Sequence, residues 1–149
     1  MTLNEGDKAP AFSANNQKGE TISLANYAGK KLVLYFYPKD DTPGCTKEAC
    51  SLRDNYKALL KQGYEILGVS PDNEKKHQKF IDKYELPFDL LADTDQAVAN
   101  AYGVWVEKSM YGRKYMGIAR TTFIIDEKGV ISEIIKKVET AAHAEQILK

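Results

Sequence analysis

The feature that most constrains this chain is an apolar run that leads into the start of a helix. Residues Lys31–Tyr37 read KLVLYFY, a short β-branched and aromatic stretch typical of a strand that is covered on both faces. Thr42 and Pro43 then suit the N-cap and the first position of a helix. We expect this helix to continue to about Gln62, with Gly63 as its stop.

The rest of the chain continues the alternation of strands and helices. The predicted elements are an N-terminal hairpin in Ala11–Leu24, strands at Tyr64–Ser70 and Asp89–Ala92, helices at Asn73–Tyr84 and Thr94–Tyr102, a strand pair at Thr121–Ile125 and Val130–Ile135, and a last helix at Ala141–Leu148 after a Thr140 cap. This order predicts an α/β fold with a central mixed β-sheet flanked by helices. A thioredoxin-like core is the natural candidate.

Length and composition limit both the size of the fold and its partners. The 149 residues, 43% of them hydrophobic, are enough for a single domain, which we expect to span 1–149. Lysine plus arginine equals aspartate plus glutamate at 21 each, which argues against a nucleic-acid or anionic-membrane partner. The N-terminal residues lack a signal-peptide pattern, and no apolar run approaches the roughly 20 residues of a membrane span. We therefore expect a cytoplasmic protein.

The chain has two cysteines, Cys45 and Cys50, and two histidines, His77 and His143. Their spacing does not match a zinc site, so no metal is expected. Because cytoplasmic thiols stay reduced, the cysteine pair is expected to be redox-active or catalytic rather than structural.

The placement of Cys45 gives the first chemical hypothesis. With Thr42 as N-cap, Cys45 occupies the third helical position, where unpaired backbone N–H groups and the helix dipole favour negative charge. A thiolate is stabilised there, and the thiolate is the reactive form of cysteine. Cys45 also begins an apolar stripe that continues through Ala49, Leu52, Tyr56 and Leu59, so we expect it to be buried. From position alone, a buried and inert cysteine remains an equal alternative.

The surrounding motif resembles the active site of peroxiredoxins. Pro38-x-x-x-Thr42-x-x-Cys45 has the proline, threonine and cysteine spacing of that family, and Thr42-Pro43-Gly44-Cys45-Thr46 with Cys50 is similar to its Q type, also called bacterioferritin comigratory protein. Further similar stretches are Tyr35-Phe36-Tyr37-Pro38, Leu67-Gly68-Val69-Ser70, Tyr102-Gly103-Val104-Trp105 and Arg120-Thr121-Thr122-Phe123-Ile124-Ile125-Asp126. The similarity covers nearly the whole chain and keeps the family's order.

The resemblance implies a thioredoxin-like fold and reduction of hydrogen peroxide or alkyl hydroperoxides without a cofactor. It implies recycling by thioredoxin or a similar dithiol, and the Q-type members favour a monomer. Cys45 matches the peroxide-attacking cysteine and Cys50 the resolving cysteine, which implies a Cys45–Cys50 disulfide. Thr42 and Arg120 match the peroxide-positioning residues, and Pro38 matches the residue that shields the pocket. Gly44 leaves room for a small substrate and offers a backbone N–H.

Other polar residues are assigned to ordinary structural places. Glu48, one turn after Cys45, is expected to be a solvated helix residue, with pairing to Arg120 as the alternative. His77 shares a helix face with apolar residues and is expected at the edge of the core, whereas His143 is expected to face solvent.

Two other functions are considered. A thioredoxin-like disulfide oxidoreductase normally carries Cys-x-x-Cys, whereas four residues separate the cysteines here. A redox sensor would use the same cysteine pair to change shape once without turning over.

Overall fold

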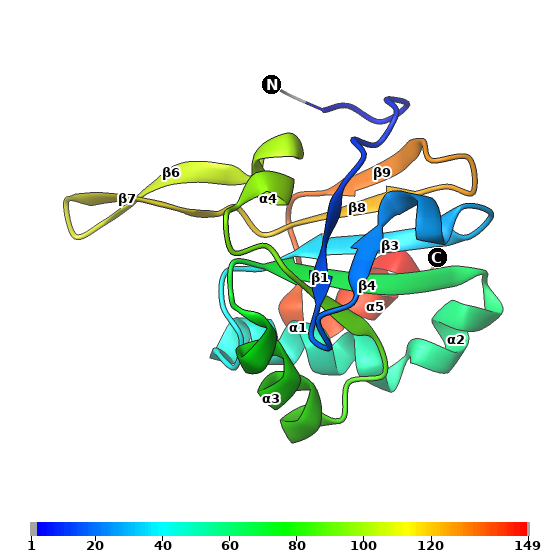
Figure 1. Ribbon diagram of the computed structural model, residues 1–149, viewed down its shortest axis with the longest axis horizontal. Helices are drawn as coiled ribbons and strands as arrows, with labels where there is room; N and C mark the ends of the chain where they lie inside the picture. The colour runs from blue at the N-terminus through cyan, green and yellow to red at the C-terminus, as the bar shows by residue number, and fades with distance from the viewer. Residues whose placement is uncertain (1–2, 149) are drawn as a thin grey trace.

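The computed structural model describes residues 3–148 and contains a seven-stranded sheet with helices on both faces (Figure 1). The strands are β1 (Ser13–Asn16), β2 (Thr21–Ser23), β3 (Lys31–Phe36), β4 (Tyr64–Ser70), β5 (Asp89–Ala92), β8 (Thr121–Ile125) and β9 (Ile131–Ile135), in the spatial order β2-β1-β5-β4-β3-β8-β9. Strands β3, β4 and β5 are parallel, whereas β1 joins β5 and β8 joins β3 in antiparallel fashion. The sheet is therefore mixed, as the sequence predicts.

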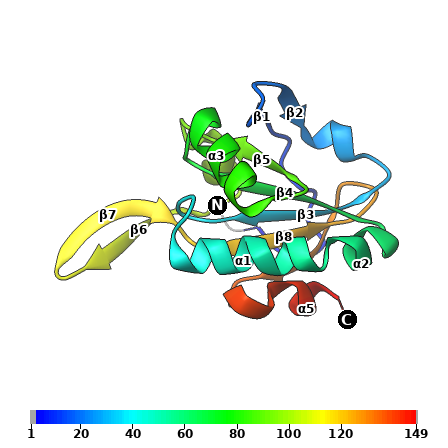
Figure 2. The ribbon, with the colours of Figure 1, turned by 90° about the horizontal axis from the view of Figure 1, so that it is seen from below.

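The helices divide unequally between the two faces of the sheet. They are α1 (Pro43–Asp54), α2 (Tyr56–Lys61), α3 (Glu74–Tyr84), α4 (Ala97–Ala101) and α5 (His143–Ile147), with short 3-10 turns η1 (Leu24–Tyr27) and η2 (Thr140–Ala142). In Figure 1, α1, α2, α3 and α5 lie below the sheet and α4 lies above it. Figure 2 shows α5 directly beside α1, so the C-terminal segment covers the helix that carries both cysteines.

Strand β3 forms the centre of both cores because its side chains alternate between the two faces. Val33 and Tyr35 pack into the cluster that includes Cys45, whereas Leu34 and Phe36 pack into the cluster on the opposite face. Each of these four β3 side chains is at most 1% exposed. A strand buried on both faces needs apolar residues at successive positions, which explains the continuous run in the sequence.

The predicted helix from Pro43 to about Gln62 is wrong in one respect, because it is interrupted at Asn55. The Asn55 side-chain amide donates to the carbonyl of Ser51 at 2.9 Å, and its backbone N–H bonds the carbonyl of Arg53. An asparagine side chain that bonds the backbone competes with the helical ladder, so α1 ends and α2 begins anew. Gly63 then stops α2 with a positive φ of 88°, as expected for a glycine C′ residue.

Two other predicted helices start later than expected. Helix α4 begins at Ala97 rather than at Thr94, since the Asp93 carboxylate accepts from the backbone N–H groups of Val98 and Ala99 and fixes the first turn there. The last helix begins as a 3-10 turn at Thr140 and becomes α-helical at His143. The remaining predicted strands and α3 lie within two or three residues of their expected bounds.

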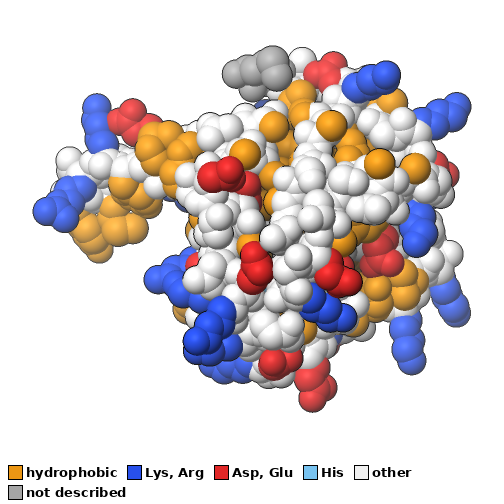
Figure 3. Space-filling view, viewed as in Figure 1, with side chains coloured by type: hydrophobic (Ala, Val, Ile, Leu, Met, Phe, Trp, Pro, Cys, Tyr) orange, Lys and Arg blue, Asp and Glu red, His pale blue; other side chains and the backbone are white. Residues whose placement is uncertain are grey.

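The sequence reasoning missed a second hairpin, formed by β6 (Trp105–Met110) and β7 (Arg113–Ile118). It projects sideways from the body of the molecule (Figures 1 and 2). Its turn carries Tyr111, which is 99% exposed, next to the half-exposed Met110. Figure 3 shows hydrophobic and basic side chains together on this projection. Its exposure gives it little of the apolar patterning from which strands are predicted.

Within residues 3–148, no helix is both long enough and apolar enough to cross a membrane.

Candidate active site

Cys45 lies where the sequence places it, in the first turn of α1 and facing the core. Its side chain is 1% exposed, and the rest of the predicted stripe packs in the same cluster, with Tyr56 at its edge. Both cysteines are free thiols. The buried sulfur therefore lies at the N-terminus of a helix, where backbone N–H groups favour an anion.

Arg120 reaches this sulfur from the turn between β7 and β8. Its Nη2 donates to Cys45 Sγ at 3.2 Å, and its Nη1 donates to Glu48 Oε1 at 2.6 Å. The guanidinium thus connects the first and second turns of α1. Burial alone would lower the pKa of Arg120, but Glu48 and Cys45 raise it above its ordinary value. The arginine remains charged, and its side chain is 23% exposed, so the site is open to solvent beside the guanidinium.

The expectation that Glu48 is solvated is wrong. Its side chain is fully buried and forms the ion pair with Arg120 that was the alternative. Burial raises the pKa of Glu48 to about 7, although Arg120 pulls it in the opposite direction. A signal was present in the sequence, because Glu48 lies three residues after Cys45 and four before Leu52 and so shares the buried face of α1.

His143 is also misplaced by the sequence reasoning, since its side chain is fully buried rather than solvent-facing. It lies at the start of α5, with Nδ1 2.8 Å from Gln146 Oε1 and Nε2 2.8 Å from Thr122 Oγ1. The same Nε2 is 3.5 Å from Glu48 Oε2. Burial lowers the pKa of His143, Gln146 opposes this, and the Arg120 cation adds to the lowering. The C-terminal segment therefore contributes to the surroundings of Glu48.

Thr42, Gly44 and Pro38 surround the first turn of α1. Thr42 is at the N-cap position, but its side chain does not cap the helix; its hydroxyl donates to the carbonyl of Lys39 at 2.8 Å. Gly44 has a plain steric reason to be glycine, because a Cβ there would lie 3.2 Å from Arg120 Nη2. Pro38 is half-buried and follows the buried Tyr37 at the end of β3.

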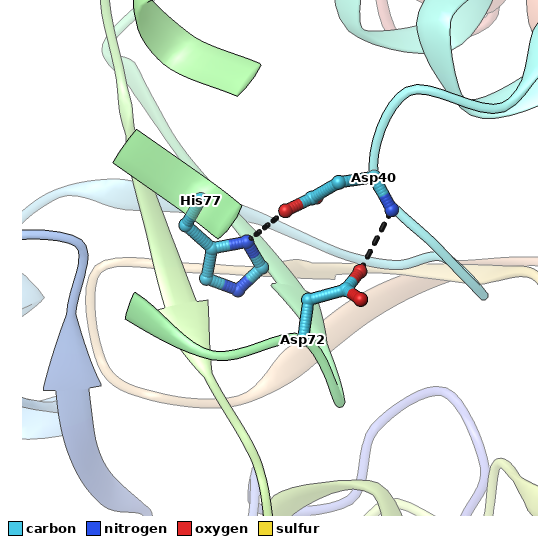
Figure 4. A group of neighbouring side chains, drawn as sticks. All are labelled: Asp40, Asp72 and His77. Carbon is cyan, nitrogen blue, oxygen red and sulfur yellow. Dashed lines mark hydrogen bonds and ion pairs between the residues drawn. The ribbon is translucent and has the colours of Figure 1, made fainter. Parts of the chain in front are cut away.

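The loop between β3 and α1 is fixed from outside by α3 (Figure 4). Asp40 Oδ2 is 2.6 Å from Nδ1 of the buried His77, whose Nε2 is 2.9 Å from the carbonyl of Leu91. The backbone N–H of Asp40 donates to Asp72 at 2.7 Å. His77 is thus in the core, and it holds the loop that leads to the first turn of α1.

A second pair of contacts holds the next residue of this loop. Asp41 has a positive φ of 57°, and its carboxylate accepts from Lys83 at 2.7 Å and from the Tyr84 hydroxyl at 2.6 Å. These contacts keep a non-glycine residue in a left-handed conformation just before Thr42.

Among the described residues, Asp40, Asp72 and His77 are close enough together to hold a metal ion. Their polar atoms already have partners, however. Nε2 of His77 faces a carbonyl and must donate, and Nδ1 lies 2.6 Å from Asp40 Oδ2. Asp72 accepts from the Asp40 N–H and from the Ser70 hydroxyl. This group is best described as a clamp on the loop.

Cys50 is half-buried and lies on the same uninterrupted helix as Cys45. Five residues of α-helix separate two Cα atoms by about 8.6 Å. A disulfide needs a Cα–Cα distance below about 7 Å, so α1 as it stands cannot hold a bond between them.

Lys108 on β6 is a further neighbour that the sequence reasoning did not find. Burial and the Arg120 cation lower the pKa of Lys108, whereas Cys45 opposes this. Strand β6 of the projecting hairpin therefore brings a lysine within electrostatic range of Cys45.

Removing the contact between His77 and Asp40 should destabilise the protein. His77→Leu removes one of two partners of the Asp40 carboxylate, whose side chain is 5% exposed and which keeps the Tyr37 hydroxyl at 2.6 Å. Breaking a buried pair typically costs about 3–5 kcal/mol. We expect the free energy of unfolding in urea to fall by that order, and the amide of Asp40 to exchange faster. Lys75→Leu, on the exposed side of α3, is the matched control. Equal stability of the two variants would contradict the clamp.

Comparison with known proteins identifies the family of this chain. Residues 5–134 match the model of the AhpC/TSA family. A Coxiella burnetii protein described as putative peroxiredoxin bcp is 52% identical over 148 residues, covering 99% of this chain and 98% of the relative. Peroxiredoxin Bcp of Bacillus subtilis is 46% identical over 149 residues, covering 100% of this chain and 95% of the relative.

Solved structures agree with these sequence relatives. The Xylella fastidiosa PrxQ structure superposes with a TM-score of 0.93 at 33% identity, covering 99% of this chain and 94% of that one. A Xanthomonas campestris bacterioferritin comigratory protein, studied for its alkyl peroxide reduction activity, gives a TM-score of 0.87 at 39% identity and covers 92% of this chain and 87% of that one. The thioredoxin-like fold is thereby confirmed. The chain belongs to the AhpC/TSA family and is a peroxiredoxin of the Bcp or Q type, a thiol-dependent peroxidase.

Proposed function

We propose that Cys45 is the sulfur that attacks the peroxide, and that the chain reduces hydrogen peroxide and alkyl hydroperoxides through it. The observation that carries this assignment is the 3.2 Å hydrogen bond from Arg120 to Cys45 Sγ in the first turn of a helix. A guanidinium and a helix N-terminus both favour the thiolate. The Xanthomonas relative's alkyl peroxide activity supports the substrate class.

The chemistry needs no cofactor in this proposal. The Cys45 thiolate donates an electron pair to the terminal peroxide oxygen, the O–O bond breaks, and the other oxygen leaves as water or alcohol after gaining a proton. Sulfur is oxidised to sulfenic acid and the peroxide is reduced. Arg120 stabilises the negative charge that spreads over sulfur and oxygen in the transition state.

Thr42, Gly44 and Pro38 are proposed to position the peroxide. Because the Thr42 hydroxyl donates to Lys39, its oxygen keeps lone pairs that accept from the O–H of a hydroperoxide. The backbone N–H groups of Gly44 and Cys45, at the second and third helical positions, add donors near the developing charge. Pro38 limits the access of water.

Cys50 is proposed to resolve the sulfenic acid as a Cys45–Cys50 disulfide. Because α1 holds the two residues too far apart, its first turns must unwind before the bond forms. Pro43 and Gly44, both weak helix formers, stand where the opening begins. A thioredoxin-type dithiol then reduces the exposed disulfide. We further propose that residues 1–149 work as one cytoplasmic domain and as a monomer.

The competing functions differ in turnover. A disulfide oxidoreductase would exchange disulfides without consuming peroxide, and a sensor would react with one equivalent and stop. Steady-state peroxide consumption with a dithiol reductant supports the proposal, whereas a single stoichiometric reaction would favour the sensor.

The two cysteines are expected to respond differently to substitution. Cys45→Ser should abolish peroxide consumption while the fold remains. Cys50→Ser should still form a sulfenic acid at Cys45, detected by dimedone trapping and mass spectrometry, but should lose most turnover with a dithiol reductant. Sulfenic acid formation that depends on Cys50 would show that the two roles are reversed.

Arg120→Ala should slow the reaction of Cys45 with hydrogen peroxide by about 10²–10³-fold, the usual cost of losing a transition-state donor. Arg120→Lys keeps the charge but lacks the two guanidinium nitrogens that contact Cys45 and Glu48 at the same time. Its rate constant should therefore lie between those of the unmodified enzyme and Arg120→Ala. Arg113→Ala, on the exposed hairpin, is the matched control. The rate constants are measured by stopped-flow tryptophan fluorescence, and an unchanged value for Arg120→Ala would place Arg120 outside the reaction.

Oxidation is expected to unwind the start of α1. Amide hydrogen exchange should show loss of protection across Thr42–Arg53 in the disulfide form, while α3 keeps its protection. Mass spectrometry must confirm the Cys45–Cys50 bond in the same sample. Equal protection in the reduced and disulfide forms would refute the unwinding step.

A further inference from the structure

The site contains two acids and one cation in contact with both. Arg120 donates to Glu48 Oε1 at 2.6 Å and to Cys45 Sγ at 3.2 Å. Glu48 is 0% exposed and Cys45 is 1% exposed. If both were ionised, two buried anions would face one guanidinium, and an uncompensated buried charge is costly. The geometry therefore favours states in which only one of the two acids has lost its proton.

His143 brings no positive charge to balance a second anion. The amide of Gln146 is oriented by the Glu139 N–H, which donates to Oε1 at 3.0 Å, and by the Lys137 carbonyl, which accepts from Nε2 at 2.9 Å. Gln146 Oε1 must therefore accept from His143 Nδ1–H. Burial favours the neutral ring, whose Nε2 then presents a lone pair to the Thr122 hydroxyl.

This tautomer also affects the outer oxygen of Glu48. Among residues 3–148, no hydrogen-bond partner reaches the buried Oε2, which lies 3.5 Å from His143 Nε2. An ionised Oε2 would be repelled by the lone pair of Nε2, whereas protonation of the carboxyl removes this repulsion. The buried Tyr35 hydroxyl also lacks a hydrogen-bond partner in the described part of the chain. Burial, and then the Glu48 charge, raise the pKa of Tyr35, so it stays neutral.

From these contacts we infer that Glu48 and Cys45 share a single proton across Arg120, so that Glu48 controls the pH range in which Cys45 is a thiolate. The equilibrium is Cys45–SH plus Glu48–COO⁻ going to Cys45–S⁻ plus Glu48–COOH, and it conserves charge inside the site. The proton need not pass between the two side chains directly, because each exchanges it with solvent. Glu48 is then a positioning residue that acts through Arg120.

The pKa of Glu48 agrees with a proton shared between Glu48 and Cys45. The pKa of Glu48, raised by burial to about 7, puts its proton exchange in the range where the enzyme would work. Lys108 is another base within range of Cys45 and Arg120; burial and then the Arg120 cation lower its pKa, whereas Cys45 opposes this. Two acids coupled in this way titrate as a pair, so neither has an independent ionisation.

The inference rests on Cys45 as the peroxide-attacking sulfur, and it makes a reciprocal prediction. Linkage requires each acid to affect the other equally. In Cys45→Ser, which has no thiolate, Arg120 is left to Glu48 alone, so the Glu48 carboxyl should ionise at a pH lower by about one unit, the coupling at which sites titrate as a pair. The readout is the ¹³C shift of the Glu48 carboxyl, assigned by through-bond correlation to the backbone of Glu48. An unchanged midpoint would overturn the inference.

The kinetic test measures the rate constant for hydrogen peroxide against pH. Glu48→Gln keeps an oxygen to accept from Arg120 but cannot become an anion, so the pH of half-maximal rate should fall by about one unit relative to the unmodified enzyme. Glu145→Gln makes the same change in charge on the exposed surface of α5 and should leave this pH in place. A purely structural Glu48 would lower the plateau without moving the midpoint downward, and that result, or an equal shift in Glu145→Gln, would overturn the inference.

These readouts separate failure of the inference from failure of the proposed function. If Cys45→Ser still consumes peroxide, the assignment of the attacking sulfur is wrong, and the inference falls with it. If Cys45→Ser is inactive but Glu48 titrates as in the unmodified protein, the attacking sulfur stands and the shared proton is refuted. A Glu48→Gln variant that fails to fold leaves the titration in Cys45→Ser to decide.

Discussion

The guanidinium of Arg120 is the contact on which the arrangement of the site depends. It bonds Cys45 and Glu48 across the first turns of α1, and it comes from the turn that joins the projecting hairpin to β8. Gly44 gives it space, and the C-terminal segment packs beside α1. Unwinding the first turn of α1 would remove the sulfur from this cation, so the contact between Arg120 and Cys45 exists only while the helix is intact.

Most of the fold was predictable because its strands are buried on both faces. A continuous apolar run such as Lys31–Tyr37 is typical of a strand that is buried on both faces. Gly63 marks a helix end because the residue after the helix adopts a positive φ, which glycine tolerates best. The position of Cys45 followed from the helix start and its apolar stripe. The placement of Arg120 beside it, by contrast, came from the family resemblance, since 75 residues separate the pair.

The misplacement of Glu48 and of His143 has one physical cause, which is that polar side chains can be satisfied by partners distant in sequence. Glu48 looks solvated until Arg120 is brought to it, and His143 looks exposed until β8 and Gln146 supply its bonds. The β6–β7 hairpin was missed for the opposite reason. It stands outside the core, so its residues lack the burial pattern on which strand prediction relies.

The interruption at Asn55 has a consequence for how far a disturbance in α1 can spread. Helix melting propagates along an unbroken ladder of backbone bonds, and here the amide of Asn55 has already replaced one rung. Opening that begins at Pro43 therefore meets a boundary before α2, whose Leu59 stays anchored in the core. If the start of α1 unwinds during turnover as we propose, the change is confined to this one short segment, and the sheet beneath it does not have to be rebuilt.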